Sequence, residues 1–244
     1  MHQKTIPILM YHSIANMPKG TKMRSLHVHP KKFQFQMRLL KLFGYKALSM
    51  SDLKPYLIGK KTGKVVGLTF DDGYKNNYVN ALPILTKLGF SATLYAVSNN
   101  IGGVNNWDTS KGLPEKKIIN EKELNEWIEY GMEIGSHTMN HVDLLNCDDT
   151  SAYQEISQSK SDLENKFKTK IKTFCYPYGS CDANIISLVK KAGYESATLT
   201  VRGRASINDN FLALPRIQIT HHTLPHLFLI KLFSNYEDKR KNSL

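Results

Sequence analysis

Short apolar runs that alternate with helical patterns constrain the fold of this 244-residue chain more than any other feature. Parallel strands need crossover helices between them, so strands and helices in this alternation indicate a parallel α/β arrangement. Seven strands of this kind fit a barrel as well as an open sheet. The predicted strands are Ile6–Tyr11, Val65–Phe70, Ala92–Val97, Met132–Ser136, Thr173–Tyr176, Ser196–Val201 and Leu212–Ile219.

Helical patterns lie between these strands, and glycines mark where several of the helices end. These glycines are Gly44, Gly89, Gly131 and Gly193. The predicted helices are Pro30–Phe43, Tyr78–Leu88, Glu121–Tyr130, Thr150–Lys166, Asp182–Ala192 and one after Thr223. No repeat or Pro/Gly/Ser-rich linker divides the chain. We therefore expect one domain over residues 1–244, with a core at about 6–219 and a C-terminal helix and basic tail at 223–244.

The formal charge of +12 favours anionic partners such as nucleic acid, acidic glycans or a phospholipid surface. The lysines are scattered, however, and there is no RNA-binding signature, so we expect solvated helix faces and no nucleic-acid partner. The amphipathic, basic end of the chain is compatible with a peripheral contact at the inner membrane face.

The expected location is the cytoplasm. No segment approaches the roughly 18 consecutive apolar residues of a membrane span. Ile6–Tyr11 reads as a first core strand, and no signal peptide is recognised before it. The three cysteines, Cys147, Cys175 and Cys181, form an odd set without CxxC spacing. This pattern is typical of reduced thiols and not of a disulfide framework.

Polar side chains of catalytic type follow most of the predicted strands. In parallel folds, the carboxyl ends of the strands form the edge where chemistry is expected. The residues at or near these ends are His12, Asp71, Asp72, His137, Tyr178 and Arg216.

Asp71 and Asp72 are adjacent carboxylates at the end of a buried strand. Such a pair is costly unless a cation or a hydrogen-bond network offsets the repulsion and the lost hydration. Adjacent side chains point in different directions, so one can bind a metal while the other acts as a base. The alternative is an Asp-Asp-Gly turn that caps the next helix.

His137 and His141 have the i, i+4 spacing that places two imidazoles on one face of a helical turn. The alternative is a helix start capped by Ser136 with two exposed histidines. Together with Asp72, the histidines form a His-His-carboxylate set with open positions for water and substrate. This set suits Zn²⁺, and also Fe²⁺, Mn²⁺, Co²⁺ or Ni²⁺.

The segment Phe174–Gly179 reads FCYPYG. An ordinary Pro-Gly turn with an aromatic core residue explains it on structural grounds. Its functional use would be a backbone N–H that faces a developing oxyanion, backed by an aromatic wall, and Pro177 and Tyr178 are candidate substrate-binding residues.

The segments TFDDG, SHTMNH and YPYG, in this order, make the chain similar to the polysaccharide deacetylase family, the NodB-homology group or carbohydrate esterase family 4. The resemblance extends from about Pro7 to Ile219. It implies a distorted (β/α) barrel and a single divalent metal, Zn²⁺ first. It also implies that Asp71 is the general base and that the Tyr178 N–H helps to stabilise the oxyanion. The implied metal ligands are Asp72, His137 and His141.

Two positions depart from the family pattern. Many members carry an arginine that pairs with the base where this chain has Cys175, and we expect Arg216 to fill that role. The late Leu-x-His of the family is not clear, since His221 and His222 fit it poorly. The opening PILMYH instead resembles the poly-N-acetylglucosamine deacetylases with an N-terminal acid motif. This makes His12 the candidate general acid, with a histidine packed at a strand end as the alternative.

The expected substrate is an N-acetylated sugar or oligosaccharide. Trp107 and Trp127 could stack on a sugar ring, although both are also typical packing residues, and the segment Ser98–Asn120 could shape the groove. Two other functions stay open. One is a glycan-binding protein without catalysis, and the other is an O-deacetylase or a deformylase acting on a lipid-linked sugar.

Overall fold

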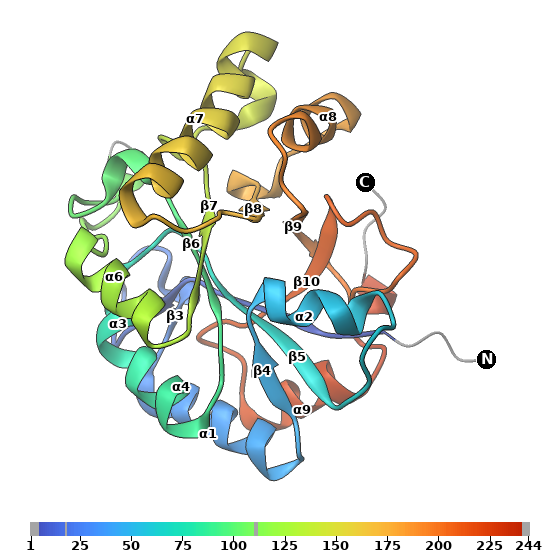
Figure 1. Ribbon diagram of the computed structural model, residues 1–244. Coiled ribbons are helices and arrows are strands. Elements are labelled where there is room, and N and C mark those ends of the chain that lie inside the picture. The colour runs from blue at the N-terminus through green and yellow to red at the C-terminus, as the bar shows by residue number, and fades with distance from the viewer. Residues whose placement is uncertain (1–4, 18, 110–111, 241–244) are drawn as a thin grey trace.

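Seven parallel strands form a closed barrel in the computed structural model, which describes residues 5–17, 19–109 and 112–240 (Figure 1). The strands are β1 (Ile8–Tyr11), β5 (Val65–Phe70), β6 (Thr93–Ala96), β7 (Glu133–Ser136), β8 (Thr173–Cys175), β9 (Ser196–Arg202) and β10 (Leu214–Gln218). The barrel closes because β1 pairs with β10 on one edge and with β5 on the other. All seven correspond to predicted strands, and the (β/α) barrel is confirmed.

An eighth strand, β4 (Lys46–Leu48), distorts the barrel and was not predicted. It pairs with the first half of β5, while β6 pairs with the second half, at Thr69 and Phe70. Both lie on the edge of β5 opposite β1, because β1 pairs along Gly67–Phe70. One edge of β5 is therefore shared by two strands. Three residues are too few to show a hydrophobic period, so the sequence gives little signal for β4.

Helices surround the barrel (Figure 1). They are α1 (Pro30–Leu42), α2 (Met50–Leu57), α3 (Lys75–Asn80), α4 (Leu82–Leu88), α5 (Asn106–Thr109), α6 (Glu121–Glu129), α7 (Asp149–Phe167), α8 (Ala183–Lys191) and α9 (Pro225–Phe233). The prediction of one helix over Tyr78–Leu88 was wrong, since α3 ends at Asn80 and α4 begins at Leu82. Pro83 lies in the first turn of α4, where its missing N–H has no helical partner to lose.

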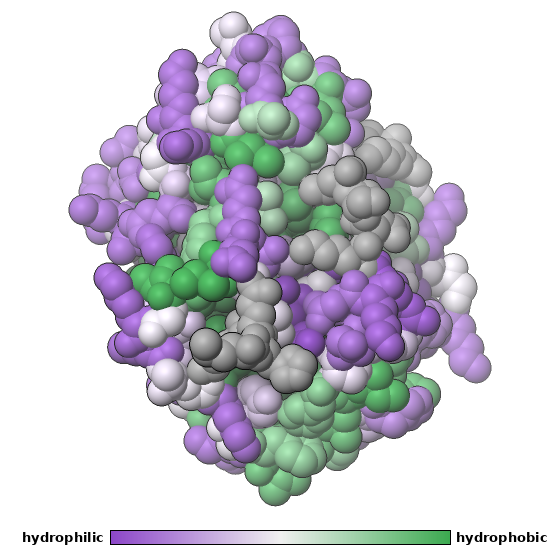
Figure 2. Space-filling model, turned by 90° about the vertical axis from the view of Figure 1, so that its right-hand side faces the viewer, coloured by the Kyte–Doolittle hydropathy of each residue, from purple (hydrophilic) through white to green (hydrophobic). Residues whose placement is uncertain are grey.

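The core extends from the barrel interior to the inner faces of the helices. Trp127 on α6 is fully buried, and its Nε1–H donates to the Glu133 carbonyl at 3.1 Å. Trp127 is therefore a packing residue, and its predicted alternative role as a sugar-stacking wall was wrong. On the face shown in Figure 2, apolar side chains gather at the lower end of the molecule, where α1 and α9 lie in Figure 1.

No helix within the described ranges is long and apolar enough to cross a membrane. The predicted basic tail lies partly outside these ranges, because residues 241–244 are not described.

A two-stranded parallel sheet follows β1. Its strands are β2 (Ser13–Ile14) and β3 (His27–Val28), paired at Ser13 with His27 and at Ile14 with Val28. Amide side chains from α3 fasten this sheet to the barrel, since Asn76 and Asn77 both accept a hydrogen bond from the Ile14 N–H. The segment after His12 is therefore held in place beside the carboxyl ends of the strands.

Candidate active site

The turn after β5 separates the two adjacent carboxylates. Asp72 and Gly73 both have positive φ, 70° and 68°, and aspartate tolerates this left-handed conformation better than most side chains. The backbone reversal sends Asp71 toward Arg216 and Asp72 toward the two histidines. Both carboxylates are buried, with 2% and 5% exposure. The sequence expectation of two directions for two carboxylates agrees with this geometry.

Asp72, His137 and His141 lie together, with their ligand atoms within 4.8 Å of one another. Asp72 Oδ1 is 3.4 Å from His137 Nε2 and 3.3 Å from His141 Nε2. Atoms that bind one tetrahedral ion at about 2.0–2.1 Å are about 3.3–3.4 Å apart. These two separations and the His-His-carboxylate chemistry therefore fit a divalent metal, which three buried side chains could hold.

Two different environments orient the histidines. The Nδ1–H of His137 donates to the Cys175 carbonyl at 2.7 Å, which directs Nε2 toward Asp72. His141 instead has a buried Nδ1 without a hydrogen-bond partner among the described residues. Its ring stacks on Trp107, with centroids 4.6 Å apart and planes 16° apart, and meets the edge of Tyr178. His141 is thus positioned largely by packing.

The prediction that the histidines occupy one face of a helical turn was wrong. After β7 the chain forms a loop in which Thr138 and His141 have positive φ, 65° and 57°. The Thr138 Oγ1 accepts a hydrogen bond from the His141 N–H at 2.9 Å and stabilises this loop. The imidazoles converge through the loop geometry, although the i, i+4 spacing is the one expected of a helix.

Asp71 forms a bidentate ion pair with Arg216, with both N–O distances at 2.7 Å. Arg216 is fully buried and also donates to Leu199 O, Thr69 Oγ1 and Cys175 Sγ. Burial by itself would raise the pKa of Asp71, but the charge and the hydrogen bonds of Arg216 outweigh it and hold the pKa below its usual value. Asp71 is therefore ionised at neutral pH. Arg216, the predicted partner of Asp71, is the residue that pairs with it.

His12 lies on the other side of this carboxylate, with Nε2 at 3.9 Å from Asp71 Oδ2. The Asn77 side chain donates to the His12 carbonyl at 2.7 Å and fixes the backbone there. Within the described ranges, neither His221 nor His222 has an ion-pair distance to Asp71, and their rings contact each other instead. The geometry thus brings His12, and not the late histidines, to Asp71.

Sequence reasoning missed His27 and Lys116. His27 is 1% exposed and carries a hydrogen-bond partner on each ring nitrogen, with Lys116 Nζ and Ser13 Oγ both at 2.6 Å. An ammonium only donates, so Nε2 accepts from Lys116 and the Nδ1–H donates to Ser13. Burial and the Lys116 charge lower the pKa of His27 to about 4, so it is neutral at pH 7. The contact joins positions 89 residues apart, and no local pattern predicts it.

A cavity of about 510 Å³ opens beside the metal-ligand cluster, with Trp107, His141 and Tyr178 in its lining. Tyr178 is 45% exposed and has a φ of 60°. The turn depends on Gly179, because a Cβ there would lie 2.0 Å from Thr200 Oγ1. Pro177 is buried beneath this turn. The structure therefore brings Trp107 and Tyr178 to one cavity, while Pro177 contributes to the support of the turn.

Comparisons with known proteins identify relatives of this chain. The sequence profile described as polysaccharide deacetylase matches residues 58–197. The YxkH protein of Bacillus subtilis is 31% identical over 217 residues, covering 88% of this chain and 71% of the relative. The poly-beta-1,6-N-acetyl-D-glucosamine N-deacetylase of Staphylococcus aureus is 28% identical over 231 residues, covering 89% of this chain and 76% of the relative.

Solved structures show the same fold. The structure of the Streptococcus pyogenes deacetylase PplD in complex with acetate aligns with a TM-score of 0.83 and 30% sequence identity. The alignment covers 94% of this chain and 99% of that chain. The motifs, the closed barrel and these relatives lead to one conclusion: the chain belongs to the polysaccharide deacetylase family, the NodB-homology group of carbohydrate esterase family 4.

Proposed function

We propose that this protein is a metal-dependent hydrolase that removes N-acetyl groups from an amino sugar or glycan. The observation that carries the proposal is that the two adjacent carboxylates have different partners. Asp71 is held ionised by Arg216, and Asp72 faces two imidazole nitrogens at 3.3 and 3.4 Å. A protein that only binds glycans needs no charged carboxylate held ready beside a metal ligand.

The metal would be held by Asp72 Oδ1, His137 Nε2 and His141 Nε2. We propose Zn²⁺, since nitrogen and oxygen ligands in this number suit it, with Co²⁺, Mn²⁺, Fe²⁺ or Ni²⁺ as alternatives. When bound, the ion supplies Lewis-acid chemistry toward the acetamide carbonyl. The protein's own residues carry out the remaining tasks.

Asp71 accepts the proton of the attacking water, because it is ionised at neutral pH and lies next to the metal ligand. The water oxygen forms a bond to the acetamide carbon, and the carbonyl oxygen becomes negatively charged. The Tyr178 N–H would donate to this oxyanion, an interaction worth about 3–4 kcal/mol for one donor in other enzymes. Arg216 keeps the carboxylate in one orientation throughout.

His12 would donate a proton to the departing nitrogen. An amine is a poor leaving group without this proton, so the C–N bond breaks as the proton is transferred. The 3.9 Å separation of His12 Nε2 and Asp71 Oδ2 supports an acid and a base that act on the same reacting group. The products are acetate and the amino sugar.

The cavity and the relatives support the proposed substrate class. Trp107 and Tyr178 present aromatic surface beside the metal ligands. The Staphylococcus aureus relative is named for poly-beta-1,6-N-acetyl-D-glucosamine, and we propose an N-acetylated glycan for this chain. The cytoplasmic location and the peripheral membrane contact stay predictions, and fractionation of cells into membrane and soluble parts tests both.

Acetate release tests the function. Metal-stripped protein is assayed on N-acetylglucosamine oligomers and nucleotide-linked N-acetyl sugars before and after Zn²⁺, Co²⁺ or Mn²⁺ is restored. We expect metal-dependent release that Asp71→Asn abolishes. Glu121→Gln is the matched control, since this exposed carboxylate pairs with Lys166 at the surface, away from the metal-ligand cluster. Stoichiometric metal binding without release on any substrate would favour the glycan-binding or deformylase alternatives.

His12→Ala tests the acid. We expect kcat to fall by about 10²–10⁴-fold, the usual contribution of a positioned acid, with metal binding unchanged. Full activity in this variant would rule out His12 as the proton donor.

A further inference from the structure

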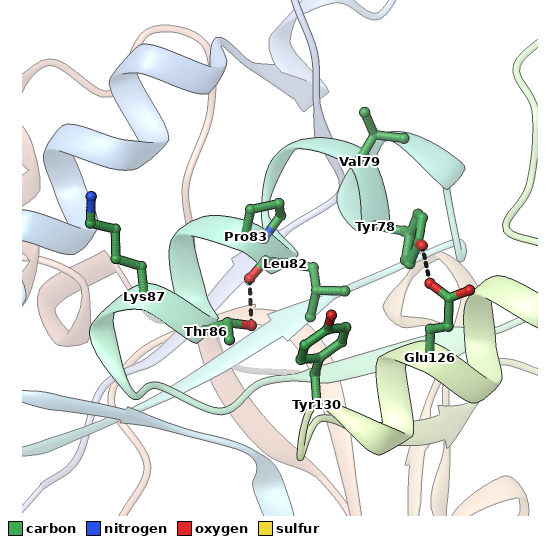
Figure 3. Close-up of a pocket in the computed structure, with 8 residues that line it drawn as sticks. All are labelled: Tyr78, Val79, Leu82, Pro83, Thr86, Lys87, Glu126 and Tyr130. Carbon is green, nitrogen blue, oxygen red and sulfur yellow. Dashed lines mark hydrogen bonds between the residues drawn. The ribbon is translucent and has the colours of Figure 1, made fainter.

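A groove of about 600 Å³ lies on the flank of the barrel, between α3 and α4 on one side and α6 on the other (Figure 3). This volume is within the range of about 300–1,000 Å³ found for small-ligand sites. Tyr78, Glu126 and Tyr130 line it, and Leu82 and Pro83 add apolar surface. Val79, Thr86 and Lys87 complete the lining, and we call this groove the tyrosine groove. None of them belongs to the site described above.

The tyrosine groove combines an aromatic surface with an oriented carboxylate. Tyr130 rises from the end of α6 between the helices and is 56% exposed (Figure 3). The Tyr78 hydroxyl donates a hydrogen bond to Glu126, which holds the carboxylate in place and raises the pKa of Tyr78 to about 12. An ionised carboxylate has about four acceptor positions, so Glu126 can accept further hydroxyl groups.

A second hollow, of about 300 Å³, lies beside the tyrosine groove. The two share Val79, and Asn76 and Lys116 line the hollow further along. The Asn76 Nδ2–H donates to Ser13 Oγ at 2.8 Å, and Ser13 directly follows His12 in the chain. The hollow therefore adjoins both the tyrosine groove and the segment that carries the candidate acid.

The chemistry of this surface fits a glycan chain. A pyranose ring has a face of C–H groups that can cover an aromatic ring, and an edge of hydroxyl groups that donate to a carboxylate. Tyr130 and Glu126 offer these two partners side by side. In the hollow, the Asn76 amide and the Lys116 ammonium each have N–H groups beyond those that they donate to Ser13 and His27, and these could donate to acetamide carbonyls.

We propose that the tyrosine groove is a second glycan-binding site, which holds part of an N-acetylated chain while another sugar of the same chain lies at the metal-ligand cluster. The proposal rests on the proposed function, since it takes the same glycan as the ligand. It makes the preferred substrate a chain of several sugars and not a single sugar. One long ligand that occupies both sites gains affinity because the second contact is intramolecular.

The test uses β-1,6-linked N-acetylglucosamine as a dimer and a pentamer. Binding is measured by calorimetry with metal-loaded Asp71→Asn protein, which cannot turn the ligand over under the proposed mechanism. Tyr130→Ala in this background should weaken pentamer binding about tenfold, the effect of losing one aromatic contact. Tyr130→Phe, which keeps the ring, and Phe35→Ala, an exposed residue on α1, should leave it unchanged.

Turnover with intact Asp71 gives a second readout. Tyr130→Ala should raise KM for the pentamer about tenfold, with kcat and the dimer parameters unchanged. Equal KM and Kd values for the pentamer with and without Tyr130→Ala would overturn the proposal of a second glycan-binding site and would leave the proposed deacetylase function standing. So would pentamer binding no tighter than dimer binding. If Tyr130→Ala weakens pentamer binding but the protein with intact Asp71 releases no acetate, the glycan site is supported and the proposed function is rejected.

Discussion

Arg216→Met would leave the Asp71 carboxylate buried without its cation. The pair is bidentate, both N–O distances are 2.7 Å, and the two side chains are 0% and 3% exposed. Removing one partner of such a buried pair typically costs about 3–5 kcal/mol, because the remaining charge stays desolvated. Typical domains have a free energy of unfolding of about 5–15 kcal/mol, so the variant should fold with a clearly reduced stability.

The contribution of Asp71 to the pH dependence of stability should have opposite signs in the native protein and in Arg216→Met. In the native protein the pKa of Asp71 lies below the ordinary value of 3.8. Its contribution to stability is therefore present above pH 4 and is lost as the pH falls through the native pKa. In Arg216→Met, burial is no longer opposed and raises this pKa above the ordinary value. The folded variant then binds the proton more readily than the unfolded chain, so it gains stability as the pH falls from 7 to 5.

Urea unfolding at pH 5, 6 and 7 measures the stability, and the profile of kcat/KM against pH measures the base. The acid limb of the profile should move upward by about two units or more, because only ionised Asp71 can accept the proton. Lys166→Met is the matched control. It breaks an exposed ion pair with Glu121 at 3.0 Å and should cost about 1 kcal/mol or less. A loss below 1 kcal/mol in Arg216→Met, or an unmoved acid limb, would refute this account of Asp71.

Three further outcomes are expected. His141→Ala should remove stoichiometric Zn²⁺ binding in equilibrium dialysis, and retention of one tightly bound ion would exclude His141 as a ligand. Gly179→Ala should lower the free energy of unfolding by about 2–4 kcal/mol in urea, because its Cβ would lie 2.0 Å from Thr200 Oγ1 at a positive φ; an unchanged midpoint would contradict this. His27 has a pKa of about 4 when folded and 6.5 when unfolded, so it should make stability fall as the pH drops from 6.5 to 4. His27→Asn should flatten that part of the stability curve, and a parallel curve would show that Lys116 and burial do not depress the pKa.

The barrel strands were predictable because each is a buried apolar run with a helix after it. The seven predicted ranges match the seven strands of the barrel. The strand ends then identified the polar residues that meet at one edge. Elements with little periodicity were missed. β4 has three residues, and α2 contains Pro55 in its interior, where proline normally argues against a helix.

The loop geometry of the site could not be predicted from spacing. The helical interpretation of His137 and His141 failed because Thr138 and His141 adopt positive φ, which non-glycine residues rarely show. The pairing of His27 with Lys116 depends on two segments that only the folded chain brings together. Arg216 was singled out by its place in the last predicted strand, and its pairing with Asp71 was expected because the resemblance showed that a cation was missing.

The contact between Asp71 and Arg216 also has a consequence for the order of folding. It joins residues 145 positions apart, and it forms where the last barrel strand, β10, pairs with the first, β1. During synthesis, Asp72, His137 and His141 leave the ribosome well before Arg216. Contacts of such long sequence separation form late, because the entropy of loop closure must be overcome first. Asp71 therefore gains its cation only as the barrel closes, and a chain that ends before β10 would contain Asp72, His137 and His141 without the ion pair that keeps Asp71 ionised.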